Sequence, residues 1–96
     1  MNSFDLRESG GGKFALIGEM TFDTADRILK SSERSFSQYP SVHVDLSQVN
    51  KADSAGLALL LEWKAQVSQR AGEITFICVP ESLLAIARTA EVSDLI

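Results

Sequence analysis

Asp53 and Ser54 are the residues of this sequence best placed to do chemistry, because they stand between an apolar strand pattern and an aliphatic helix pattern. A serine there would act as a nucleophile, cap the helix or accept a phosphate. A nucleophilic serine needs a general base, usually a histidine, that is oriented by a third group. The only histidine, His43, falls inside the strand pattern, and the stretch ADSAG lacks the first glycine of the G-x-S-x-G elbow. We therefore expect no enzyme.

Helix capping and phosphorylation both remain open for this corner. Ser and Asp each satisfy amide donors at a helix start, which is worth about 1 kcal/mol, but one helix does not need two such residues. A phosphate on Ser54 would lie at the positive end of the helix. It would add roughly −1.5 to −2 charges, enough to repel a partner without unfolding the domain. Gly56 costs a helix about 1 kcal/mol relative to alanine, so we expect a strand or a partner to approach its backbone closely.

The composition disfavours several other kinds of site. The chain has 96 residues and a net charge of −4, and its nine Lys and Arg residues are scattered rather than clustered. Nucleic acids are held by clustered basic residues, and an acidic protein is poorly suited to anionic lipid. One histidine and one cysteine leave no plausible zinc site. Lys13 follows a glycine but precedes Phe14 instead of the Ser or Thr of a phosphate loop. We expect no metal and no cofactor.

The sequence also bears on location. The N-terminal stretch MNSFDLRESGGG lacks the basic start and apolar run of a signal peptide, and no stretch approaches the ~20 apolar residues of a membrane span. We expect a cytoplasmic protein. The single cysteine, Cys78, cannot form an internal disulfide, and the apolar run around it predicts a buried side chain in a strand.

The corner is held by elements that the residue patterns predict in the order β-β-α-β-α-β-α. We expect a single α/β domain over residues 1–96, with parallel strand pairs where strands and helices alternate. The expected elements are a β-hairpin of residues 3–9 and 13–20 with a turn at 10–12, a helix within 21–40, a strand at 42–46, a helix at 54–72, a strand at 73–79 and a helix at 80–92.

Three of these elements carry more detailed predictions. The first helix should be capped by Asp23 and bury the stripe Ala25, Ile28, Leu29, Ser32 and Phe36. The second helix should end at Gly72 in a left-handed conformation. The strand at 73–79 has few polar residues, which predicts a central strand covered on both faces.

The corner and its flanks resemble the signature of STAS domains, which occur in anti-sigma-factor antagonists and at the ends of sulphate transporters. Residues 45–47 (DLS) and 53–57 (DSAGL) match the family pattern, and the resemblance extends over nearly the whole chain. Within the family, DSAGLALLL is most similar to the MlaB type, small subunits bound to the ATPase of a phospholipid ABC transporter. The resemblance implies a mixed four-stranded sheet with helices packed on one face. It also implies that Ser54 takes the position of the phosphorylatable or functionally required Ser/Thr.

The second helix predicts a binding surface beside Ser54. On a helical wheel, Leu57, Leu60, Leu61 and Val67 form the stripe that faces the sheet, whereas Leu59 falls on the far side and Trp63 on the flank. These two side chains tuck under a neighbouring loop, stand as isolated surface residues, or form an apolar interface, in which a tryptophan would be a natural hot spot. The expected docking surface comprises Asp53, Ser54, Ala55, Gly56, Leu59, Glu62 and Trp63.

Residues and resemblance together predict a non-enzymatic binding subunit. The favoured function is that of a MlaB-like subunit docked on the ATPase of a phospholipid ABC transporter that maintains outer-membrane lipid asymmetry. Such a protein would be cytoplasmic and peripheral to the inner membrane through its partner. The alternative is an anti-sigma-factor antagonist that binds an anti-sigma factor kinase and is inactivated by phosphorylation of Ser54.

Overall fold

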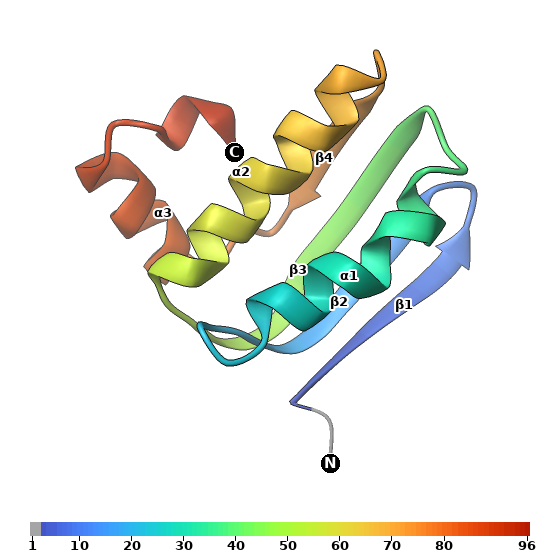
Figure 1. Cartoon of the computed structure of the whole chain (residues 1–96). Coiled ribbons are helices and arrows are strands. Elements are labelled where there is room, and N and C mark those ends of the chain that lie inside the picture. Colours follow the sequence, from blue (N-terminus) through green and yellow to red (C-terminus); the bar gives the residue numbers. More distant parts are fainter. Residues whose placement is uncertain (1–2) are drawn as a thin grey trace.

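A computed structural model describes residues 3–96 of the chain as one α/β domain (Figure 1). Its elements follow the predicted order: β1 (Phe4–Gly10), β2 (Lys13–Met20), α1 (Ala25–Phe36), β3 (Ser41–Ala52), α2 (Ser54–Gln69), β4 (Glu73–Ile77), α3 (Glu81–Thr89) and a short 3-10 helix (Ser93–Leu95). No helix within residues 3–96 is long and apolar enough to cross a bilayer.

The sheet is mixed and has the strand order β1-β2-β3-β4. β1 and β2 are antiparallel, whereas the pairs β2–β3 and β3–β4 are parallel. α1 and α2 lie side by side across one face of the sheet, and α3 lies beside α2 (Figure 1). The carboxyl ends of β2 and β3 therefore meet at one edge, where each strand leads into a helix.

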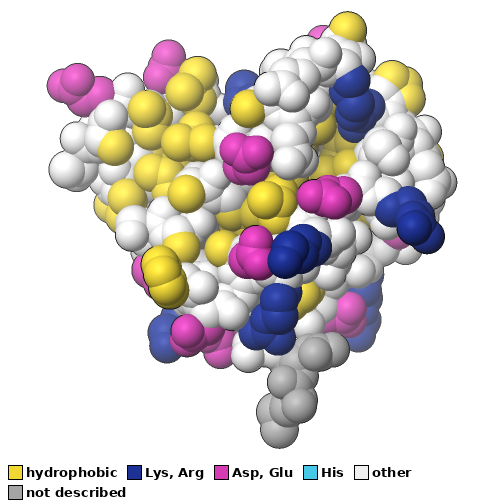
Figure 2. Space-filling view, in the orientation of Figure 1, with side chains coloured by type: hydrophobic (Ala, Val, Ile, Leu, Met, Phe, Trp, Pro, Cys, Tyr) yellow, Lys and Arg dark blue, Asp and Glu magenta, His cyan; other side chains and the backbone are white. Residues whose placement is uncertain are grey.

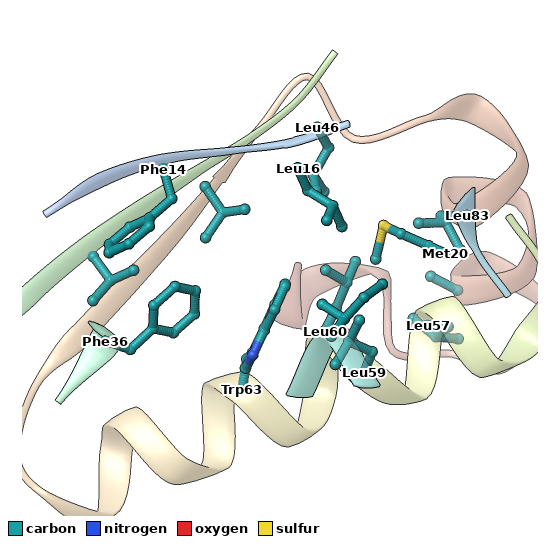
Figure 3. Packing of buried hydrophobic residues seen from close by; sticks show 14 residues of the cluster. Phe14, Leu16, Met20, Phe36, Leu46, Leu57, Leu59, Leu60, Trp63 and Leu83 are labelled. Carbon is teal, nitrogen blue, oxygen red and sulfur yellow. The ribbon is translucent and has the colours of Figure 1, made fainter. Parts of the chain in front are cut away.

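The core lies between the helices and the sheet. Strand residues that alternate along β2 and β3, such as Leu16 and Val44, point into it and are fully buried. On α1 the predicted stripe is confirmed, because Ile28, Ser32 and Phe36 are buried. Figure 3 shows these apolar side chains converging on one cluster.

Trp63 corrects the sequence prediction most clearly. Its side chain is fully buried and projects from α2 into the cluster (Figure 3), where its ring lies 5.2 Å from that of Phe36 and 6.4 Å from that of Phe76. The indole Nε1–H donates a hydrogen bond of 2.7 Å to Ser32 Oγ on α1. Leu59 is only 3% exposed, whereas Leu61, expected in the core, is half-buried. The side of α2 that was expected to face solvent is covered by α1.

The last strand also differs from its prediction. β4 is an edge strand covered on one face only, and Thr75 and Ile77 on its other face are exposed. Cys78 lies just beyond the strand with a positive φ of 56° and is exposed, so the prediction of a buried cysteine is wrong.

Two helix ends differ from their predictions as well. The residue that turns left-handed after α2 is Ala71, with a φ of 59°, and not Gly72. Gly72 is needed for another reason, since a Cβ there would lie 2.8 Å from the carbonyl oxygen of Pro40. At the start of α1 the N-cap residue is Thr24 and not Asp23.

Candidate functional site

Asp53 is the cap of α2 and also ties the preceding loop to it. Its Oδ1 accepts a hydrogen bond of 2.9 Å from the backbone N–H of Ala55, which satisfies one amide donor of the first turn. Its Oδ2 accepts one of 3.1 Å from the backbone N–H of Phe22, in the loop between β2 and α1. A single carboxylate thus fixes the two connections that leave β2 and β3, and Asp53 has a structural role.

Ser54 is the first residue of α2 and is exposed. Because Asp53 caps the helix, the Ser54 hydroxyl is not needed for that purpose. It makes none of the side-chain hydrogen bonds found among residues 3–96. The first turn of α2 contains no acidic residue, so the positive end of the helix next to Ser54 is offset only by the Asp53 carboxylate. The hydroxyl is therefore accessible to a modifying enzyme or a partner.

Gly56 was expected to form part of the docking surface, but it is buried and does not reach that surface. A Cβ at this position would lie 2.7 Å from the Met20 carbonyl oxygen and 3.3 Å from Leu83 Cδ2. Both groups belong to this domain, at the end of β2 and on α3. The close backbone approach predicted for Gly56 is thus an internal one, and it lets α2 begin directly against the end of the sheet.

A shallow apolar groove of about 470 Å³ lies between α1 and α2, next to Ser54. Its lining is formed by Phe22, Ala25, Asp26, Leu29, Ala55, Ala58, Leu59 and Glu62. Figure 2 shows hydrophobic side chains between the two helices with acidic side chains around them. The groove is open to solvent and has carboxylates on both helices.

Phe22 is the residue that the sequence reasoning missed. Its side chain is 85% exposed, the highest value among the large hydrophobic residues of the described chain, and it lines the groove. A single exposed apolar side chain is common on protein surfaces, but Phe22 continues the apolar lining of the groove, and contiguous exposed apolar surface marks binding sites. The signal in the sequence was a phenylalanine in the polar run TFDTAD, which was assigned to a helix instead.

The structure brings together only part of the predicted docking surface. Ser54 and Glu62 are exposed, and Asp53 and Ala55 are partly buried at the same corner. Leu59 belongs to the floor of the groove, and Trp63 lies beneath it in the core. Trp63 therefore cannot contact a partner in this conformation, and Phe22 takes its place as the exposed aromatic residue.

The arrangement holds no catalytic pair at Ser54. His43 lies near the start of β3, on the face of the sheet opposite the helices, because its neighbours Val42 and Val44 point into the core. Nine residues of extended strand separate His43 from the end of β3, a distance of about 30 Å. Among residues 3–96 there is also no group of three or more His, Cys, Asp or Glu side chains that could hold a metal ion.

Comparisons with known proteins agree with this fold. A family model described as "Mlab, STAS domain" matches residues 5–96, whereas no curated protein sequence matches the chain. Among solved structures, the anti-sigma factor antagonist SpoIIAA in its unphosphorylated form has a TM-score of 0.73 at 14% identity, with 95% of this chain and 83% of that chain covered.

The phosphorylated form of SpoIIAA, a Bacillus cell fate determinant, gives a TM-score of 0.71 at 14% identity, covering 95% of this chain and 86% of that chain. Part of Mglu also matches, with a TM-score of 0.60 at 18% identity over 80% of this chain and 19% of that one. At these identities the solved structures establish a shared fold.

Proposed function

The chain belongs to the STAS domain family, and from this membership we propose that it is a MlaB-like subunit that docks on the ATPase of a phospholipid ABC transporter. STAS domains are generally non-catalytic modules that bind or regulate other proteins. The proposal places the docking surface at the start of α2 and along the groove between α1 and α2. The protein would then lie at the inner membrane through its partner.

The observation that carries this proposal is the exposed ring of Phe22 beside the exposed Ser54. Asp53 accepts hydrogen bonds from the backbone N–H groups of Phe22 and Ala55, so the backbone of the corner is preorganised and loses little conformational freedom on binding. The groove supplies further apolar area around Ala55 and Ala58. A partner that covers the corner would remove an aromatic side chain from water, which is the usual source of affinity at the centre of an interface.

Phosphorylation of Ser54 would act as a switch at this surface. A phosphate on the hydroxyl would remain hydrated in the free domain, since Ser54 is exposed. In the complex it would lie among Phe22, Ala55 and Ala58, where burying a charge without a partner is costly. The modification would therefore weaken docking and leave the fold intact.

A second candidate is an anti-sigma-factor antagonist that binds an anti-sigma factor kinase. The fold shared with SpoIIAA supports this second candidate. The structure of SpoIIAA is known in unphosphorylated and phosphorylated forms. Both candidates use the same corner and the same serine. They differ in the identity of the partner, and the family description "Mlab, STAS domain" supports the transporter subunit.

Affinity purification of the tagged full chain, followed by mass spectrometry, distinguishes the two candidates. Recovery of an ABC ATPase supports the transporter subunit, and recovery of an anti-sigma kinase supports the antagonist. Ser54→Asp supplies the test of the switch, with Ser54→Ala as the matched control. Because Asp53 already caps α2, both variants should melt like the wild type. We expect Ser54→Asp to lose the partner and Ser54→Ala to retain it; equal recovery with both variants would contradict the switch.

A further inference from the structure

The groove between α1 and α2 combines an apolar lining with acidic side chains at its rim. Its floor and ends are apolar, formed by Phe22, Ala25, Leu29, Ala55, Ala58 and Leu59. Two carboxylates line it, Asp26 on α1 and Glu62 on α2. Glu33 is exposed on α1 and follows Asp26 by seven residues, which is two helical turns, so it lies on the same side of α1. Figure 2 shows acidic side chains on both sides of the hydrophobic strip.

Nearby positive charge offsets these acidic groups only in part. Arg70, at the end of α2, donates to the carbonyl oxygens of Phe36 and Tyr39. Lys30 pairs with Asp26 at 3.1 Å, but both side chains are exposed, so the pair is weak and easily exchanged. Arg27 is held away from the groove, with its guanidinium 5.7 Å from the centroid of the Phe4 ring. Neither Glu33 nor Glu62 forms a salt bridge among the described residues. The open apolar strip thus has a rim of net negative charge.

We propose that this groove takes an amphipathic helix of the partner protein whose apolar stripe is flanked by Lys or Arg, an inference that rests on the proposed docking function. The groove runs between two helices, and a third helix can lay an apolar face along such a groove with anchors at i, i+3, i+4 and i+7. Basic flanks would then lie over Glu33 and Glu62. Anionic lipid and nucleic acid are disfavoured as occupants because both would meet the acidic rim.

The basic flanks and the Ser54 switch act at separate places. Eight residues of α2 separate Ser54 from Glu62, which corresponds to about 12 Å along the helix axis. This exceeds the screening length of about 8 Å at physiological ionic strength. A basic side chain placed over Glu62 therefore offsets a phosphate on Ser54 only weakly. The same groove can attract a basic helix and still reject it when Ser54 is phosphorylated.

Two synthetic helical peptides of about 18 residues test this proposal directly, since shorter helices are marginal in water. Both carry the same leucine stripe, and they differ only in lysine or glutamate flanks. Titration into the isotopically labelled full chain gives the affinity and, from amide shifts, the location. We expect the lysine peptide to bind at least about tenfold more tightly, with shifts at Leu29, Ala55 and Ala58. Equal affinities, or shifts centred elsewhere, would overturn the proposal.

Charge reversal in the protein supplies the matched control. Glu33→Lys combined with Glu62→Lys should abolish or reverse the preference for the lysine peptide. Glu73→Lys, on the edge strand β4 and likewise exposed, changes net charge away from the groove and should leave the preference intact. An equal effect of Glu73→Lys per charge would show attraction by net charge alone and would overturn the proposal. If the two peptides bind equally while Ser54→Asp still blocks partner capture, the proposal for the groove is overturned and the proposed function stands.

Discussion

Ser32→Ala should destabilise the domain because it leaves a buried donor without an acceptor. The Trp63 Nε1–H donates to Ser32 Oγ over 2.7 Å, and both side chains are fully buried. Ser32 Oγ in turn donates to the Leu29 carbonyl oxygen at 2.8 Å, so the hydroxyl serves both neighbours. An unsatisfied buried N–H costs about 1–3 kcal/mol. Against a total stability of about 5–15 kcal/mol, this is a large fraction.

A double-mutant cycle with Trp63→Phe isolates this hydrogen bond from the change in packing. Phenylalanine has no N–H to leave unsatisfied, and Ser32 Oγ keeps its bond to Leu29. Ser32→Ala should therefore cost less in the Trp63→Phe background, with a coupling energy of about 1 kcal/mol or more. Urea unfolding followed by far-ultraviolet circular dichroism measures all four proteins, including those without tryptophan. An equal cost of Ser32→Ala in both backgrounds, or no cost in the wild type, would refute the reasoning.

Two further predictions concern other contacts of the fold. Gly56→Ala should destabilise the domain by about 1–3 kcal/mol in chemical unfolding, because the new Cβ would lie 2.7 Å from the Met20 carbonyl oxygen. Alanine is the better helix former, so a variant without this close contact would be stabilised. A stabilised variant would therefore contradict the close approach. The hydrogen bond between Tyr39 and Glu8, helped by partial burial and by the charge of Glu8, raises the pKa of Tyr39 above its ordinary value of about 10. Since the folded state favours the neutral phenol, its contribution to stability is complete below pH 10 and is lost as the pH rises through the raised pKa. Ultraviolet titration of this sole tyrosine should give a midpoint that falls on Glu8→Gln, and an unchanged midpoint would contradict the contact.

The order of elements and the corner at Asp53 and Ser54 could be predicted from the sequence because they depend on local patterns. A capping acid and an aliphatic run follow one another within a few residues, and both were identified correctly without knowledge of distant parts. The strand before them was predicted to end at Leu46, whereas β3 extends to Ala52. The close approach at Gly56 was also predicted from the local pattern. What approaches it, the end of β2, is 36 positions away in the chain and is set by the sheet.

The errors arose where burial depends on elements distant in the chain. A helical wheel of α2 assigns one face to the sheet, but α1 and α3 cover its two flanks as well. Trp63 and Leu59 are buried for this reason, although their angular positions lie outside the stripe that faces the sheet. Similarly, the apolar run of β4 indicates a strand but not its place at the edge. Phe22 was missed because its polar run was assigned to a helix, and the exposure of a loop residue depends on which distant elements cover it.

The central claim is that the corner formed by Phe22 and Ser54 binds the partner. The most direct measurement is the dissociation constant of the purified partner ATPase for Phe22→Ala, with Ile77→Ala as a control at an exposed apolar side chain outside the groove. Because Phe22 is 85% exposed, its substitution should change stability by no more than about 0.5 kcal/mol. Our account predicts that Phe22→Ala weakens binding at least about tenfold and that Ile77→Ala does not. An unchanged dissociation constant for Phe22→Ala would contradict it.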